Sequence, residues 1–291
     1  MADESLPMRP LTTGELLDSA VAVLRRRPVR LLGIGLALAG AEQAVLFPLR
    51  HHLLTDAHDY TEVLFRPSTF MALVLLIAVG LGCEAGIVAL LGAVAARPAR
   101  DLLVADLPGM ESMVVGGRRP VAAVALSGII GVAGFLTFYL GGVPWVLWFM
   151  LTGLITPTLM TDAYARAGAA PRRIGVARAF GRGVALAARS GVRAGRIRLF
   201  GYLIWWGIRL LIAYAGTFAL AGLLELSSDT AVNVLGYVLW TGINAVAYAM
   251  IACLDATLHL ETRMRIEGLD IMLSRALRRG LPIDAALAVP R

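Results

Sequence analysis

The sequence predicts an all-α membrane protein with six transmembrane helices, and three observations lead to this fold class. Hydrophobic residues make up 58% of the 291 residues and charged residues only 16%, whereas soluble domains average about 45–50% and about 25%. The apolar residues fall in runs of about 20 residues, which is long enough to cross a bilayer. Short arginine-rich stretches separate these runs, as is typical of membrane proteins.

The first predicted element is an amphipathic surface helix over residues 11–27. Thr12 and Glu15 have the spacing of a capping box. Its apolar face is formed by Leu16, Leu17, Ala20, Val21 and Leu24.

Three hairpins of two spans each follow in one membrane domain. The predicted spans are 31–49 and 70–95 (hairpin 31–95), 121–140 and 145–164 (hairpin 121–164), and 199–224 and 231–254 (hairpin 199–254). A basic surface helix over 174–198 and a further surface helix over 261–279 complete the chain.

The distribution of arginine predicts the orientation. Nearly all arginines precede the first span, lie between spans two and three or four and five, or follow span six. These segments should be cytoplasmic, since basic residues concentrate on that side of a membrane. Both termini are therefore expected in the cytoplasm. The 27 basic residues include no lysine, which suggests a GC-rich bacterial gene and hence the bacterial plasma membrane.

A soft internal repeat is visible at the ends of the spans. The sequence RRPV occurs at residues 26–29 and again at 118–121. Residues 159–163 (LMTDA) also resemble residues 252–256 (ACLDA). Three related parallel hairpins would explain this, and parallel repeats occur in some transporters. The alternative is that every cytoplasmic helix start in a GC-rich gene looks similar.

Three charged residues lie deep within predicted spans: Glu42, Glu84 and Arg209. At 1.5 Å per residue, each lies roughly 15–17 Å from the cytoplasmic edge. An unpaired charge there costs at least about 3 kcal/mol. We therefore expect Arg209 to pair with Glu84, Glu42 or both. Such a network could simply lock the helices together, or it could form a proton relay or a polar substrate site.

Gly82 and Gly86 flank Glu84 with the spacing of a small-xxx-small motif. This spacing favours close helix packing. Residues 80–85 also imitate a dinucleotide-binding fingerprint, but no strand precedes them and they lie in a span, so we reject that interpretation.

The predicted helix 174–198 carries a basic face formed by Arg178, Arg182, Arg189, Arg193 and Arg196. A basic amphipathic helix of this kind lies on a membrane surface and contacts anionic lipid. The alternative is a docking surface for an acidic protein partner. Nucleic acid is not expected, since aromatic residues do not interleave with the arginines.

The remaining polar residues predict no metal or cofactor. The first loop holds several potential ligands, but their spacing matches no standard site. These residues are His51, His52, His58, Asp56, Asp59 and Glu62. Asp162 and Asp255 close spans four and six, where they could cap helices, pair with arginines or contact a lipid head group. Nucleophile-elbow, phosphate-loop and zinc-protease motifs are absent from the sequence.

The two ends of the chain carry motifs that suggest a family. Residues 10–18 read PLTTGELLD and are followed by arginines and a span, and residues 263–270 read RMRIEGLD after Leu254 and Asp255. These motifs resemble bacterial membrane domains found with glycerophosphoryl diester phosphodiesterases, and their stand-alone actinobacterial relatives, over residues 8–275. Family members with activity carry a separate barrel of about 250 residues. This chain has no room for one, so the resemblance implies a membrane module without the catalytic residues.

Three functional hypotheses follow. The first is a non-catalytic scaffold or subunit of a membrane assembly that binds lipid, a protein partner or a second copy of itself. The second is a transporter or permease subunit that uses the deep charges. The third is an intramembrane enzyme acting on lipid through Asp162, Asp255 or the outer histidines.

Overall fold

A computed structural model of the chain describes residues 6–7, 9–54, 66–104, 119–166, 169–226 and 228–279. Within them, six helical segments are long and apolar enough to cross a membrane. The prediction of an all-α membrane fold with six spans is therefore confirmed. Of the potential ligands in the first loop, Asp56, His58, Asp59 and Glu62 lie outside the described residues.

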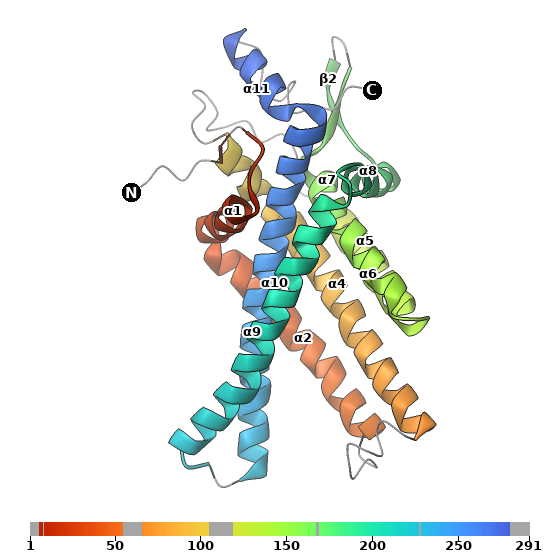
Figure 1. The fold of residues 1–291 in the computed structure, drawn as a ribbon, viewed down its shortest axis with the longest axis vertical. Helices are drawn as coiled ribbons and strands as arrows, with labels where there is room; N and C mark the ends of the chain where they lie inside the picture. Colours follow the sequence, from red (N-terminus) through yellow and green to blue (C-terminus); the bar gives the residue numbers. More distant parts are fainter. Residues whose placement is uncertain are drawn as a thin grey trace.

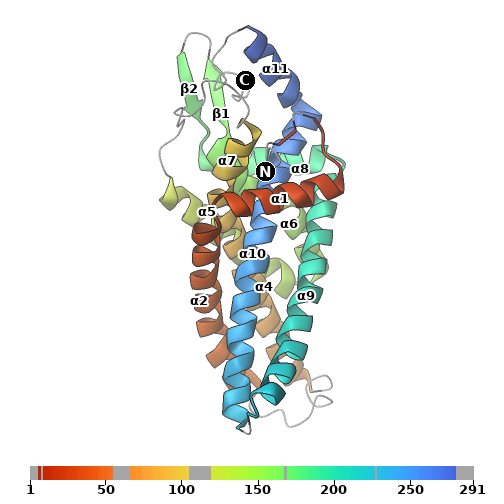
Figure 2. The same ribbon diagram turned by 90° about the vertical axis from the view of Figure 1, so that its left-hand side faces the viewer.

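The helices form three consecutive hairpins with shorter elements at one end (Figure 1). The first hairpin is α2 (Pro28–Leu54) with α4 (Pro67–Leu103), the second α5 (Pro120–Tyr139) with α6 (Val143–Thr152) and α7 (Ile155–Thr161), and the third α9 (Arg193–Leu223) with α10 (Asp229–Glu267). The shorter elements are α1 (Thr13–Arg26), α8 (Val176–Arg189), α11 (Leu269–Arg278), β1 (Ala163–Arg166) and β2 (Ala169–Arg173). We call the end that carries them the arginine-rich end (Figure 2).

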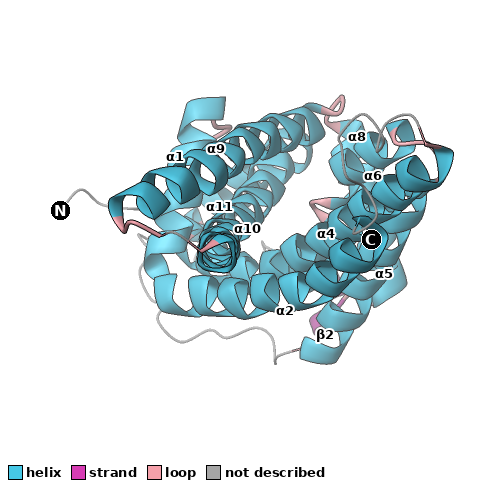
Figure 3. Ribbon diagram, turned by 90° about the horizontal axis from the view of Figure 1, so that it is seen from below, coloured by secondary structure: helices cyan, strands magenta, loops and turns pink. Residues whose placement is uncertain are grey.

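Helix α10 organises the bundle. It packs against α1, α2, α4 and α9, and a view along the bundle shows it end-on between α9 and α2 (Figure 3). Its 39 residues span about 58 Å at 1.5 Å per residue, whereas the hydrocarbon core of a bilayer is about 30 Å thick. The helix therefore extends well beyond the bilayer and carries its C-terminal charges into the arginine-rich end.

Helix α1 begins as predicted. The Glu15 backbone N–H donates to the Thr12 hydroxyl at 3.4 Å, and the Thr12 N–H donates to the Glu15 carboxylate at 2.8 Å. Arg9 also binds Glu15, and these hydrogen bonds lower the pKa of Glu15 to about 2. The helix crosses the bundle and buries Leu16 and Ala20 against α10 and α4. Its apolar face is thus covered by protein.

The fourth span is not one helix, contrary to the prediction. It breaks at Gly153 and Leu154, between α6 and α7. The physical reason lies one turn later, because Pro157 has no backbone N–H and its ring clashes with the carbonyl of the residue four positions earlier. That residue is Gly153, so the regular helical hydrogen bonding ends there.

The basic helix predicted over 174–198 is two helices. α8 ends at Arg189 and α9 begins at Arg193. Gly191 and Val192 between them have positive φ values of 63° and 60°, which reverse the chain. Residues 193–198 therefore form the first turns of the fifth span. The segment before α8 also differs from the prediction, since β1 and β2 form a short antiparallel hairpin.

The predicted start of the surface helix over 261–279 is also wrong. Residues 261–267 continue α10, and a separate α11 begins at Leu269. Gly268 has a φ of 64°, a left-handed conformation that glycine adopts without strain and that commonly ends a helix. Leu269 and Leu273 of α11 are buried in the cluster that also contains α1 residues.

Candidate functional site

The deepest polar site lies between the spans, at the positions of the predicted charges. Arg209 on α9 donates through Nη1 to Glu84 Oε1 on α4 at 2.6 Å. The Tyr202 hydroxyl donates to the other oxygen of Glu84 at 3.0 Å. The side chains of Arg209 and Glu84 are 2% and 7% exposed, so this ion pair is buried. The predicted pairing of Arg209 with Glu84 is therefore present.

Glu42 on α2 belongs to the same site but bonds differently. Its Oε2 accepts a hydrogen bond from the Tyr248 hydroxyl of α10 at 2.7 Å, and the residue is 5% exposed. It forms no ion pair with Arg209, although Nε and Nη2 of Arg209 are buried without a hydrogen-bond partner. We call these residues, together with Tyr202 and Glu84, the mid-membrane cluster.

The glycines beside Glu84 allow α4 and α5 to approach closely. A Cβ at Gly82 would lie 2.9 Å from the carbonyl oxygen of Gly131, and a Cβ at Gly86 would lie 3.2 Å from that of Ser127. Both glycines therefore face α5, as the small-xxx-small spacing indicates. This packing fixes the rotation of α4, and with it the direction in which Glu84 points.

A second buried ion pair joins the break in span four to the third hairpin. Arg198 Nε donates to Asp255 Oδ1 at 2.7 Å, and the two side chains are 3% and 1% exposed. Arg198 also donates to the carbonyl of Phe149 and lies 3.8 Å from the centre of its ring. The Phe149 carbonyl lies where the helix is interrupted, so Arg198 supplies a donor that the backbone lacks.

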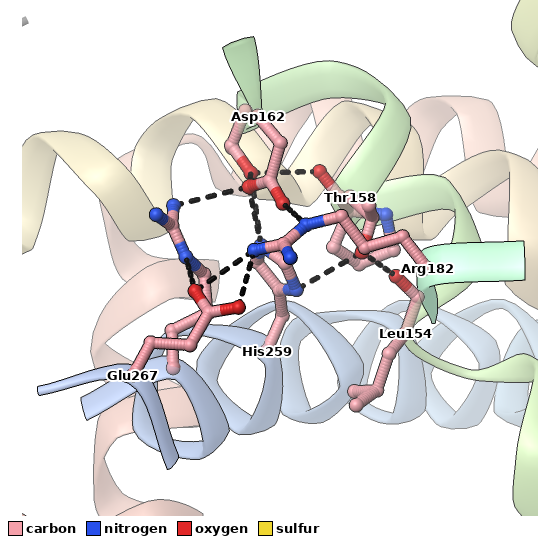
Figure 4. A network of polar contacts seen from close by, with 9 residues as sticks. Leu154, Thr158, Asp162, Arg182, His259 and Glu267 are labelled. Atoms are coloured by element: carbon pink, nitrogen blue, oxygen red, sulfur yellow. Dashed lines mark hydrogen bonds and ion pairs between the residues drawn. The ribbon is translucent and has the colours of Figure 1, made fainter. Parts of the chain in front are cut away.

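The third site, which we call the Asp162 network, lies at the arginine-rich end. Figure 4 shows Asp162, Arg182, His259 and Glu267 converging from α8, α10 and the end of α7. Asp162 accepts from Arg182 at 2.6 Å, and from Arg263 and His259 at 3.1 Å. Glu267 binds the same two arginines at 2.7 Å and 2.9 Å.

These contacts decide the ionisation of Asp162. Burial by itself raises the pKa of this carboxyl, but the charges of Arg263, His259 and Arg182 and the His259 hydrogen bond outweigh it. The pKa of Asp162 consequently lies well below its ordinary value. Asp162 is thus an anion at neutral pH that joins three elements, and it is a poor proton donor or acceptor there.

The predicted basic face of five arginines is divided by the fold. Arg182 is turned inward to Asp162 and Glu267, and Arg193 donates to Glu261 at 2.8 Å. The other three, Arg178, Arg189 and Arg196, are exposed. Two of the five arginines are therefore engaged with carboxylates of the same chain, and contact of this face with lipid or a partner stays a prediction. The two arginines are engaged because α10 extends far enough to present its own carboxylates to α8 and α9.

Sequence reasoning missed His259, Arg263 and Glu267. The signal was a row of charged or ionisable residues spaced four apart along one helix: Asp255, His259, Arg263 and Glu267. Residues at this spacing share a helix face. The prediction placed the end of the sixth span at residue 254, and for that reason the row was not recognised as part of a continuous helix.

The Asp162 network has the residue types of a nucleophilic triad but not an accessible nucleophile. The Thr158 hydroxyl lies 3.2 Å from His259 Nδ1, and His259 Nε2 lies 3.1 Å from Asp162. Thr158 is fully buried and donates to the carbonyl of Leu154 at 2.6 Å. Asp255 lies in its separate pair with Arg198. Within the described part of the chain, no group of three or more metal-ligating side chains gathers.

Comparisons with known proteins add no family. No protein-family model, curated protein or solved structure matches the chain. The resemblance to the membrane domains of glycerophosphoryl diester phosphodiesterases stays a prediction that rests on the end motifs.

Proposed function

We propose that this chain is a non-catalytic membrane scaffold, or a subunit of a membrane assembly, that holds anionic lipid at its arginine-rich end. The supporting observation is how its charges are divided. Deep charges bond to groups of the same bundle, whereas Arg26, Arg27, Arg30, Arg189 and Arg196 are exposed at the end that carries α1 and α8. In this proposal that end and both termini face the cytoplasm of a bacterial cell.

The physical basis is the surface potential of the cytoplasmic leaflet. Anionic lipid attracts a basic residue near the membrane surface with about 1 kcal/mol. α8 lies beside the ends of the spans (Figure 2), so in this proposal Arg189 on α8 and Arg196 in the first turn of α9 would meet the lipid head groups. Their binding would be weakened by salt, because exposed charges are screened over about 8–10 Å.

The test compares lipid retention by two double variants. Arg189→Gln with Arg196→Gln removes the head-group contacts, and Arg275→Gln with Arg278→Gln on α11 removes the same charge further from the spans. After purification from mixed lipid, the ratio of retained anionic to zwitterionic lipid is measured by mass spectrometry. We expect about a thirtyfold fall for the first variant and less than about threefold for the second. Equal falls would mean that only net charge matters, and no fall would refute the proposal.

One observation favours the transporter alternative, namely the unused donors of Arg209 in mid-membrane. A transported anion would need a water-filled path to that guanidinium. The 2% exposure of the Arg209 side chain supports the scaffold instead. Uptake of labelled anions into vesicles that contain the protein, compared with Arg209→Gln vesicles, would separate the two functions.

A further inference from the structure

Within the part of the chain that the structure describes, one buried carboxylate, Glu42, forms no ion pair with a cation. Among the described residues, Glu84, Asp162, Asp255 and Glu261 each bind at least one arginine within 3.1 Å. Glu42 is equally buried, at 5% exposed, and its hydrogen bond comes from the neutral hydroxyl of Tyr248. If every group of the mid-membrane cluster were ionised as in water, the cluster would carry one net negative charge.

The surroundings of Glu42 offset this charge only in part. Tyr248 from α10 binds it, and the charged or titratable groups near enough to act on it are Glu84 and Cys83 from α4 and Arg209 from α9. Glu84 repels a second carboxylate, and Arg209 is bound to Glu84 at 2.6 Å. An isolated charge in a dry, apolar environment is expensive, and such groups normally neutralise by taking up or releasing a proton.

Arg209 adds an independent observation. Its Nε and Nη2 atoms are buried and make no hydrogen bond, although its Nη1 does. A guanidinium presents five N–H donors in a planar fork. The guanidinium carbon lies 5.6 Å from the centre of the Tyr248 ring, and this tyrosine also binds Glu42.

We propose that Glu42 is a reversible proton-binding site in the middle of the membrane, and that the spare donors of Arg209 receive Glu42 when the proton leaves. In the arrangement seen here, Oε2 of Glu42 accepts from Tyr248, and the neutral acid carries its proton on Oε1. On release, the O–H bond breaks, the proton passes to water that reaches the cluster when the bundle opens, and the carboxylate keeps the electron pair. Arg209 then bridges Glu84 and Glu42 through its Nη1 and its unused donors. The site is independent of the lipid contacts at the arginine-rich end.

The first experiment is infrared spectroscopy of the purified full-length protein in lipid nanodiscs. A protonated carboxylic acid has a C=O stretching band that is well separated from the bands of carboxylates. At neutral pH we expect this band in the wild type, its loss in Glu42→Gln, and its retention in Glu261→Gln, a matched buried acid that is paired with Arg193. A wild type without the band, or a band that Glu42→Gln leaves unchanged, would overturn the proposal.

A second variant covers the case in which Glu42→Gln does not fold. Tyr248→Phe removes the hydrogen bond to Glu42 and keeps the carboxylic acid, so the band should move to higher frequency without losing intensity. An unmoved band would assign the proton to another residue and refute the site.

A third variant tests whether Arg209 binds the ionised carboxylate of Glu42. Glu84→Gln frees the guanidinium, and one carboxylate then faces one cation, so Glu42 should lose its proton and the band should disappear. A band that persists in Glu84→Gln would show that Arg209 cannot reach Glu42.

Discussion

Replacing Gly153 with alanine should destabilise the protein strongly, although a single methyl group is added. The backbone at Gly153 has φ −58° and ψ −33°, which alanine adopts readily. The new Cβ would lie 2.5 Å from Arg198 Nε and 2.7 Å from Asp255 Oδ1. These two atoms form the buried ion pair, so the methyl group cannot fit unless the pair moves apart.

The magnitude follows from the burial of that pair. Disrupting a buried ion pair so that a charge is left uncompensated costs about 3–5 kcal/mol. Exchanging glycine for alanine at a backbone conformation that alanine can adopt otherwise gains about 0.4–1 kcal/mol. We therefore expect the free energy of unfolding to fall by about 2–4 kcal/mol. The matched control is Gly128→Ala in α5, where a Cβ would meet nothing within 4 Å, and this variant should be as stable as the wild type or slightly more so.

The assay is equilibrium unfolding of the detergent-solubilised protein by increasing SDS, followed by circular dichroism. A double-mutant cycle isolates the cause, because Arg198→Ala makes room for the methyl group. In that background, Gly153→Ala should lose most of its cost. If Gly153→Ala unfolds at the same SDS fraction as Gly128→Ala, the ion pair yields without cost and our reasoning is refuted. An undiminished cost in the Arg198→Ala background would place the cause elsewhere.

Two further predictions concern the other sites. Asp162→Asn should lower the free energy of unfolding by about 3–5 kcal/mol at neutral pH, since Arg182 and Arg263 lose the more deeply buried of their two shared anions. The pKa of Asp162 is lowered in the fold, so its contribution is complete above its unfolded value of about 4 and is lost as the pH falls further. Thermal unfolding should therefore show a steeper acid decline in the wild type than in Asp162→Asn, and parallel curves would contradict this. Gly82→Ala should cost about 1–3 kcal/mol by overpacking, because its Cβ would lie 2.8 Å from Phe135 Cβ. Gly86→Ala, with a nearest contact of 3.2 Å, should cost less in the same SDS titration, and the reverse order would contradict the packing.

The sequence by itself determined the six spans, because crossing a bilayer requires a long apolar run whatever the rest of the chain does. It also determined the start of α1, since the bonds between Thr12 and Glu15 join residues three positions apart. The depth of Glu42, Glu84 and Arg209 followed from the fixed rise of a helix. Each of these features depends on local geometry alone.

The choice of partners was decided only by the tertiary structure. Arg209 could have paired with Glu42 or Glu84 at similar depth, and the close approach of α4 to α5 at Gly82 turned Glu84 toward it. Arg182 shared a predicted face with exposed arginines, yet it binds Glu267, 85 residues away in the sequence. Such pairings depend on how neighbouring helices are rotated and tilted. Rotation and tilt are set by contacts between distant segments, and spacing along one helix does not contain that information.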